Sequence, residues 1–301
     1  MISGAAASDL SHKGIVTNRT FRESVRQPVE SLQPDRCNSG PVLRLPLPYG
    51  DSRKAASIVL NGVLFDLDGT LLDIDLDSFF REYFSALGPV LAEALGRDGD
   101  VRAGLDAVLE GTQAMSLPHP TSTNREVFNA RFHELTGSDL DLDEYARPLE
   151  RFYRNVFPSL RGSMGPMDGA REAVETALGL GLKVAIATNP IFPRSAIEER
   201  MRWAGVADLD VHLVTTYENM HAAKPSPAYF VETAELLGVE PAEALMVGDD
   251  RVLDMTAADV GMRTFYVGSG TAPGTDFSGM LGDLIGLLPR LTRPPSTTAS
   301  E

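Results

Sequence analysis

One stretch decides the fold of this chain: Val63-Leu64-Phe65-Asp66-Leu67-Asp68-Gly69-Thr70-Leu71-Leu72. It begins as an apolar run of strand character and ends in two aspartates, Asp66 and Asp68, before a Gly-Thr turn. Because alternate side chains of an extended chain point the same way, both carboxylates share one side if the strand geometry continues that far. Two neighbouring acids are costly for fold stability alone, so the arrangement predicts a site that binds a hard cation and acts on an oxyanion.

The composition is that of an ordinary globular protein: 301 residues, 43% hydrophobic and 23% charged. No apolar run approaches the roughly 20 residues of a membrane span, so we expect a soluble protein with no membrane partner. Cys37 is the only cysteine, which excludes an internal disulfide and is consistent with a cytoplasmic location. The net charge of −15 argues against broad binding to nucleic acid. The oligomeric state is not determined by these features.

Short apolar runs alternate with helical patterns in residues 58–73 and 166–290, which we interpret as one core domain. The pattern predicts an α/β fold, a Rossmann-like parallel sheet with helices on both faces. The strands are expected at residues 58–65, 183–187, 211–214, 244–247 and 263–267.

Residues 74–165 differ from the core, because their apolar side chains follow helical spacing and no strand pattern is evident. A helical segment inserted after the first strand predicts a mostly helical cap domain above the carboxyl end of that strand. Residues 1–57 contain five prolines and no sustained periodicity, so we expect a flexible leader there. Residues 291–301 are predicted to form a disordered tail.

Polar residues follow several of the predicted strands. Thr188 and Asn189 come directly after one strand, and Asp249 comes directly after another. Lys224 precedes a predicted helix, beside Pro225. Because ligands of open α/β sheets collect beyond the carboxyl ends of the strands, we expect these side chains to meet Asp66 and Asp68 there.

This ordered set resembles the four motifs of the haloacid dehalogenase-like (HAD) hydrolase superfamily, in its phosphatase-type branch. The resemblance extends from about residue 58 to 268, and it implies a Rossmann-like core with a helical cap inserted after the first motif. The four motifs correspond to Phe65–Thr70, Ala185–Asn189, Ala223–Pro227 and Val247–Asp250, with Asp254 further on.

The resemblance also implies a mechanism. Asp66 would attack the substrate phosphorus and become an aspartyl phosphate, and Asp68 would serve as the acid and then the base. Mg²⁺ would be held by Asp66, by the main-chain carbonyl of Asp68 and by Asp249, with Asp254 in the outer shell. The second acid of motif four is open between Asp250 and Asp254, because the family tolerates several spacings. Asp254 is our choice, with capping of the following helix as its alternative role. Asp250 could tighten metal binding or simply lie in solvent.

Binding of the phosphate group is assigned in the same way. Thr188 and Lys224 would be catalytic residues that stabilise the oxygens of the transferred phosphoryl group. The amides around Gly69 and Thr70 would contact the phosphate oxygens, and Asn189 would either contact the substrate or shape the turn.

The predicted function is a Mg²⁺-dependent phosphatase that acts on a small phosphorylated metabolite, because a cap excludes larger substrates. A phosphomutase acting on a sugar phosphate uses the same motifs and stays open as the alternative. Dehalogenation is disfavoured, because the dehalogenase branch lacks an acid at the position of Asp68. A non-catalytic binding protein predicts the loss of Asp66, Asp68, Lys224 or Asp249, and all four are present.

Overall fold

The computed structural model describes residues 59–96, 101–138, 143–270 and 274–292. The predicted leader, residues 1–57, lies outside these ranges, as do residues 293–301 of the predicted tail. The last helix reaches Leu291, one residue into the segment predicted as tail. None of the described helices is long and apolar enough to cross a membrane.

The core is a six-stranded sheet in the order β5-β4-β1-β6-β7-β8, in which all neighbours are parallel. The predicted α/β class and its parallel sheet are therefore confirmed. The central strand β1 pairs with β4 on one side and β6 on the other, so that Gly62 lies opposite Lys183 and Ala244. The strands are β1 (Gly62–Phe65), β4 (Lys183–Ile186), β5 (Leu213–Val214), β6 (Ala244–Gly248), β7 (Arg263–Val267) and β8 (Phe277–Gly279).

Helices cover both faces of this sheet, and the alternation of side chains along β1 explains why. Val63 and Phe65 are fully buried in one core cluster, whereas Leu64 is fully buried in another. The first face is covered by α7 (Ala170–Gly179), α8 (Arg194–Trp203) and α10 (Leu281–Leu291). The second is covered by α9 (Pro227–Leu237) and the 3₁₀ helix η3 (Met255–Val260), and a short 3₁₀ turn, η2 (Pro241–Glu243), leads into β6.

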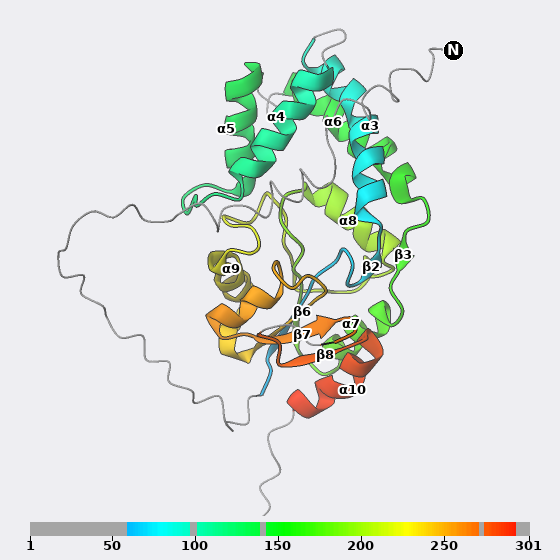
Figure 1. Cartoon of the computed structure of the whole chain (residues 1–301), viewed down its shortest axis with the longest axis vertical. Helices are drawn as coiled ribbons and strands as arrows, with labels where there is room; N and C mark the ends of the chain where they lie inside the picture. The colour runs from blue at the N-terminus through cyan, green and yellow to red at the C-terminus, as the bar shows by residue number, and fades with distance from the viewer. Residues whose placement is uncertain (1–58, 97–100, 139–142, 271–273, 293–301) are drawn as a thin grey trace, which may run out of the picture.

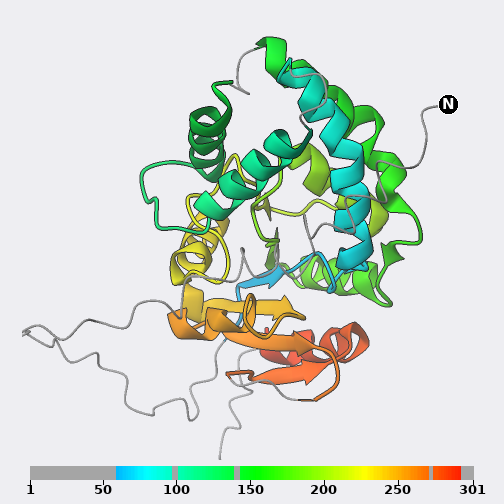
Figure 2. The same cartoon turned by 45° about the horizontal axis from the view of Figure 1, so that its top comes forward.

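Four helices form a block on one side of the sheet, within the segment predicted as a cap (Figures 1 and 2). We call them the helical block: α3 (Leu76–Ala94), α4 (Val101–Ala114), α5 (Asn124–Thr136) and α6 (Asp143–Asn155), followed by the 3₁₀ helix η1 (Phe157–Arg161). Two short strands that were not predicted, β2 (Leu72–Asp73) and β3 (Gly165–Pro166), pair antiparallel where the chain leaves and re-enters the core. This pairing closes the insertion at its base.

Candidate active site

A cavity of about 210 Å³ lies between the carboxyl ends of the central strands and the start of α3. We call it the catalytic pocket. Five carboxylates and two cationic side chains line it, so a phosphate group would meet an excess of negative charge without a further cation. Its charged lining residues are Asp66, Asp68, Asp249, Asp250, Asp254, Arg200 and Lys224.

Asp66 and Asp68 both line this pocket, as their spacing predicted. The ladder of β1 continues past Phe65, because the Asp66 amide donates to the Val247 carbonyl at 2.9 Å. The chain then turns at Gly69, whose φ of 88° lies in the left-handed region that favours glycine. A Cβ at this position would lie only 2.5 Å from an oxygen of Asp249, so the turn and the close approach both require glycine.

The amides of Gly69 and Thr70, predicted to contact phosphate oxygens, have partners within the turn. The Gly69 amide donates to the Leu72 carbonyl at 2.8 Å, and the Thr70 amide donates to the Leu67 carbonyl at 3.3 Å. Both donors are therefore engaged within the turn rather than left for a phosphate group. The Thr70 hydroxyl donates to Oδ1 of Asp249 at 3.0 Å, so Thr70 orients a carboxylate of the site.

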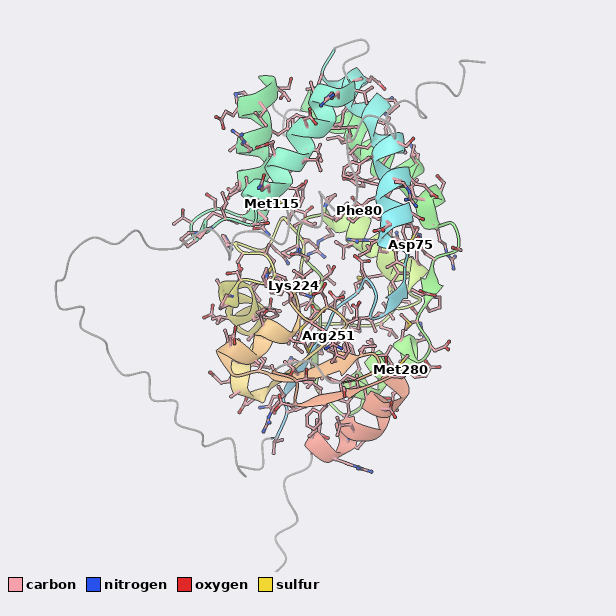
Figure 3. The ribbon with its side chains drawn as sticks, in the orientation of Figure 1. Asp75, Phe80, Met115, Lys224, Arg251 and Met280 are labelled. Atoms are coloured by element: carbon pink, nitrogen blue, oxygen red, sulfur yellow. The ribbon has the colours of Figure 1, made fainter. Side chains whose placement is uncertain are left out.

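Lys224, labelled in Figure 3, lies in the interior of the molecule, and only 1% of its side chain is exposed. Its Nζ donates to Oδ1 of Asp66 at 2.8 Å and to Oδ1 of Asp254 at 2.6 Å. Burial alone would lower the pKa of Lys224, but the carboxylates of Asp254 and Asp66 raise it above the ordinary value. Lys224 therefore stays protonated and holds two carboxylates from different parts of the chain together.

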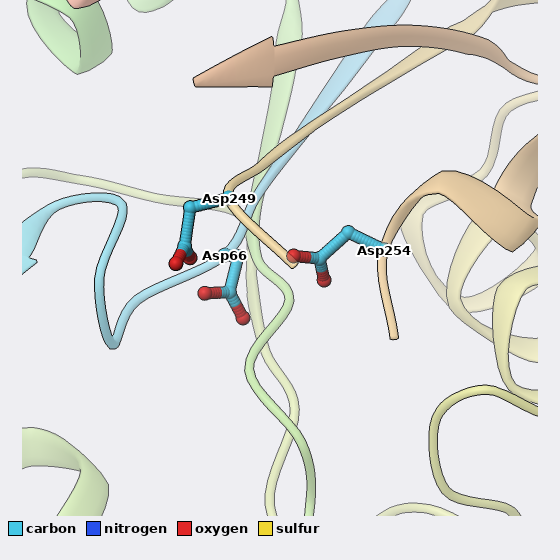
Figure 4. A group of neighbouring side chains, drawn as sticks. All are labelled: Asp66, Asp249 and Asp254. Atoms are coloured by element: carbon cyan, nitrogen blue, oxygen red, sulfur yellow. The ribbon is translucent and has the colours of Figure 1, made fainter. Parts of the chain in front are cut away.

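Three carboxylates converge beside Lys224, and Figure 4 shows them turned toward one another. One oxygen from each of Asp66, Asp249 and Asp254 lies within 4.8 Å of the other two. Burial and the charge of Asp66 raise the pKa of Asp249 to about 7, and burial raises the pKa of Asp254 although Lys224 opposes it. Three crowded, partly desolvated carboxylate oxygens are a donor set that fits Mg²⁺.

The structure distinguishes the two candidates for the second acid of motif four. Asp254 is 1% exposed, contacts Lys224 and belongs to the converging group. Asp250 instead accepts the amides of Val252 and Leu253 at 2.8 and 3.0 Å, which shapes the turn before η3. The Asp250 amide donates in turn to Oδ2 of Asp254 at 3.0 Å, so one acid orients the other.

Thr188 and Asn189 line the same pocket, just beyond β4. Thr188 is 2% exposed, and its carbonyl accepts the hydroxyls of Thr215 at 2.7 Å and Tyr229 at 3.0 Å, which fixes the backbone there. The Asn189 side chain accepts the Lys224 amide at 3.2 Å and so joins the second and third motifs.

Arg200 of α8 is a pocket residue that the sequence analysis did not identify. It is 2% exposed and one of its Nη1 hydrogens is donated to Oδ2 of Asp68. Burial raises the pKa of Asp68, and the charge of Arg200 opposes this without cancelling it. A signal was present, because Arg200 lies three residues after Ile197 and one before Met201, on the apolar face of the helix.

A second cavity, of about 320 Å³, adjoins the catalytic pocket and shares Phe80, Ile191 and Phe192 with it. We call it the aromatic chamber, because the rings of α3, α5 and α6 dominate its walls (Figure 3 labels Phe80). Its aromatic lining consists of Phe80, Tyr83, Phe84, Phe128, Tyr153, Phe192 and Tyr217. The helical block thus supplies most of the apolar wall above the charged site.

The chain is similar to known proteins. A family model described as haloacid dehalogenase-like hydrolase matches residues 60–259. The haloacid dehalogenase-like hydrolase domain-containing protein 3 of Xenopus laevis is 37% identical over 134 residues, which are 44% of this chain and only 52% of that protein. A phosphoglycolate phosphatase of Mesorhizobium japonicum is 27% identical over 213 residues, covering 69% of this chain and 82% of that one. The crystal structure of a HAD phosphatase from Thermococcus onnurineus is 26% identical with a TM-score of 0.48, covering 76% and 98%.

Proposed function

This chain belongs to the haloacid dehalogenase-like hydrolases, and from that premise we propose that it is a Mg²⁺-dependent phosphatase of a small phosphorylated metabolite, working through an aspartyl phosphate. The matched residues, 60–259, contain every side chain on which the proposal rests. Similarity to a phosphoglycolate phosphatase over 69% of the chain supports phosphoester hydrolysis. A cytoplasmic location is proposed from the sequence alone.

One observation carries the proposal: Asp66 and Asp68, two residues apart, lie in contrasting environments. Asp66 is ion-paired with Lys224, whose Nζ lies 2.8 Å from Oδ1 and holds the carboxylate that would act as the nucleophile in place. The Asp68 side chain is 17% exposed, and desolvation raises its pKa although Arg200 opposes this, which favours the protonated form that an acid needs. A pair of carboxyl groups whose environments differ in this way is suited to divide the nucleophilic and the acid roles.

In the first step, an oxygen of Asp66 attacks the phosphorus. The bond between phosphorus and the leaving oxygen breaks, and that oxygen takes the proton of Asp68. Lys224 stays on Asp66 and, together with Thr188 at the pocket wall, offers positive charge and a hydroxyl to the transferring group. The products are an alcohol and an aspartyl phosphate.

In the second step, water attacks the phosphorus of the aspartyl phosphate, and Asp68, now a carboxylate, takes a proton from it. The bond between phosphorus and Asp66 breaks, which restores the Asp66 carboxylate and releases inorganic phosphate. Asp68 thus returns to its protonated state, and each turnover consumes one water. General acid and base catalysis of this kind contributes about 10²–10⁴-fold.

The charge balance of the pocket supports the metal requirement. Asp66, Asp249 and the main-chain carbonyl of Asp68 would hold Mg²⁺. Asp254 would lie in the outer shell, where it accepts a hydrogen bond from Lys224. When bound, the ion would offset the repulsion between these carboxylates and the substrate phosphate.

The aromatic chamber supports a small substrate. Its volume of about 320 Å³, added to the catalytic pocket, is within the usual range for metabolite sites. The lining is mostly aromatic and aliphatic, which favours a leaving alcohol with an apolar part. A phosphomutase would use the same pocket, so the assay below includes its reaction.

The test is phosphate release from a panel of phosphorylated metabolites, with Mg²⁺ and after chelation by EDTA. We expect turnover only with Mg²⁺, and a loss of at least about 10³-fold in Asp66→Asn, which removes the nucleophile. Asp210→Asn, at an exposed aspartate outside the pocket, is the matched control and should retain activity.

Two results would contradict the proposal. If Asp66→Asn turned over substrate at the wild-type rate, an aspartyl phosphate on Asp66 would be excluded as the intermediate. Isomerisation of a sugar phosphate without net phosphate release would instead identify a mutase. Trapping the acid-stable fraction of ³²P on the wild-type chain, and its absence from Asp66→Asn, would locate the intermediate.

A further inference from the structure

Helix α8 carries three arginines, and only one of them is buried. The side chain of Arg200 is 2% exposed, whereas those of Arg194 and Arg202 are 49% and 57% exposed. Arg194 and Arg202 pair with glutamates of their own helix, as solvated surface arginines do. Arg200 instead points from the apolar face of the helix toward the catalytic pocket, where it is one of the lining residues.

The surroundings of Arg200 do little to compensate for its burial. Its guanidinium carbon lies 4.6 Å from the centre of the Phe192 ring, and among the described residues its one ion pair is with Asp68. Its Nε and Nη2 have no hydrogen-bond partner in the part of the chain that the structure describes. A buried charge with a single ion pair and two unpartnered nitrogens adds little to the stability of the fold, so stability alone does not explain why an arginine stands here.

The contact with Arg200 makes the two carboxyl oxygens of Asp68 inequivalent. Oδ2 accepts a hydrogen of Arg200, whereas Oδ1 has no partner among the described residues. An oxygen that is accepting a hydrogen bond from a cation is a poor place for a proton. The transferable proton of Asp68 therefore belongs on Oδ1, and the planar guanidinium holds the carboxyl group in one orientation.

We propose that Arg200 is a positioning residue for the acid of the first step: it fixes the Asp68 carboxyl group and directs its proton from Oδ1 to the leaving oxygen. The inference rests on the proposed phosphatase function and names a residue that the four motifs do not include. It requires that Arg200 act through Asp68 rather than on the phosphate group directly.

Substrates with different leaving groups distinguish a positioning role of Arg200 from a purely structural role. A p-nitrophenolate departs readily without a proton, whereas an alkoxide requires one. Arg200→Met should therefore lower kcat/KM, which reports the first step, by about 10²-fold or more for an alkyl phosphate such as glycerol 3-phosphate, within the range for loss of general acid catalysis. For p-nitrophenyl phosphate the loss should be less than about tenfold. Arg202→Met, two residues along the same helix, should leave both values unchanged.

A double-mutant cycle tests whether Arg200 acts through Asp68. In an Asp68→Ala background, Arg200→Met should cause no further loss, because the group that it positions is gone. Arg200→Lys keeps the charge without the planar fork, and it should show the same selective loss for the alkyl phosphate. It also carries the test if thermal unfolding shows that Arg200→Met does not fold.

The outcomes are distinguishable. Equal losses on both substrates, or additive losses in the cycle, would overturn the positioning role while leaving the phosphatase proposal intact. Unchanged activity of Arg200→Met would do the same. Absence of turnover by the wild-type protein on every phosphoester would overturn the proposed function itself, and this inference with it.

Discussion

Asp249 lies where its own charge is unfavourable, because it is mostly buried and faces Asp66. These two causes raise its pKa from 3.8 to about 7, even though the Thr70 hydroxyl donates to it. Without a metal ion, the folded protein therefore keeps a proton on Asp249 that the unfolded chain has already released. The stability of the metal-free protein is then linked to pH.

The sign follows from where the proton resides. Between about pH 4 and pH 7 the folded state binds this additional proton, so Asp249 alone lowers the free energy of unfolding of the metal-free protein by up to about 1.4 kcal/mol per pH unit as pH rises. The raised pKa of Asp254 acts in the same direction. The Mg²⁺ that we propose for this site would replace that proton, so the stabilisation by Mg²⁺ should increase over the same range.

Chemical denaturation in EDTA and in Mg²⁺, at about pH 5 and about pH 7.5, measures both trends. Asp249→Asn is the control, because the amide does not titrate: its metal-free stability should depend less on pH, and Mg²⁺ should stabilise it little. A metal-free wild-type protein that becomes more stable from about pH 5 to pH 7.5 would contradict the raised pKa.

At the scale of single residues, the sequence predicted those site residues that belong to a short local motif. Asp66, Asp68 and Lys224 were predicted to meet because each stands at a recognisable position beside a strand or helix, and the structure brings them together. The turn bonds of the Gly69 and Thr70 amides were not predicted, because their partners depend on how tightly the turn closes. The partner of Asp68 was missed, since Arg200 lies 132 residues away.

Among the helices of the block, α4 and α5 approach closely at Gly111. A Cβ there would lie 2.8 and 2.9 Å from two ring carbons of Phe128, which also lines the aromatic chamber. Gly286 of α10 offers a matched site, because it is also inside a helix but a Cβ there would meet nothing within 4 Å.

We therefore expect alanine to have opposite effects at the two glycines. Gly286→Ala should stabilise the protein by about 0.5–1 kcal/mol through helix propensity. Gly111→Ala gains the same propensity but forces the Phe128 ring to shift, so it should destabilise by about 1–3 kcal/mol. Equilibrium denaturation of both variants gives the comparison, and stabilisation by Gly111→Ala would show that the two helices are not packed this closely.

The length of the strands explains which of them could be predicted from the sequence. Five of the six core strands were predicted, because each is an apolar run bounded by turn residues. The sixth, β8, has only three residues, none fully buried, and β2 and β3 have two each. Strands this short display no period. The strands β2 and β3 pair because the insertion brings Leu72 opposite Pro166, whereas β8 pairs with β7 at the edge of the core sheet.

In the molecule as a whole, the helical block is fastened to the catalytic loops through Asn124, at the start of α5. Asn124 is fully buried, and its side-chain amide donates to the carbonyls of Pro190 at 2.9 Å and Ala222 at 3.2 Å. Pro190 directly follows Asn189, and Ala222 precedes Lys224 by two residues. The partners in these bonds lie 66 and 98 residues apart in the sequence, so no local sequence pattern predicts them.

Because of this placement, Asn124→Ala should affect catalysis without touching either cavity, since Asn124 lines neither. The substitution leaves the buried carbonyl of Pro190 and the partly buried carbonyl of Ala222 without their donor, which should destabilise the protein by about 1–3 kcal/mol. It also releases the loops that position Asn189 and Lys224, so kcat/KM should fall even at temperatures where the variant is fully folded. Asn61→Ala, at an exposed asparagine bonded to Glu243 before β1, should change neither property appreciably.

Hydrogen exchange of folded Asn124→Ala locates the effect. If Asn124 joins the block to both loops, the amides near Pro190 and Ala222 should exchange faster than in the wild-type protein, and so should those at the start of α5, where the Asn124 amide donates to the Met220 carbonyl at 2.8 Å. The amides of β1 and β6 should keep their protection, because the sheet does not depend on this contact. Faster exchange confined to α5, with the loops unchanged, would mean that the loops hold Asn189 and Lys224 in place without the helical block.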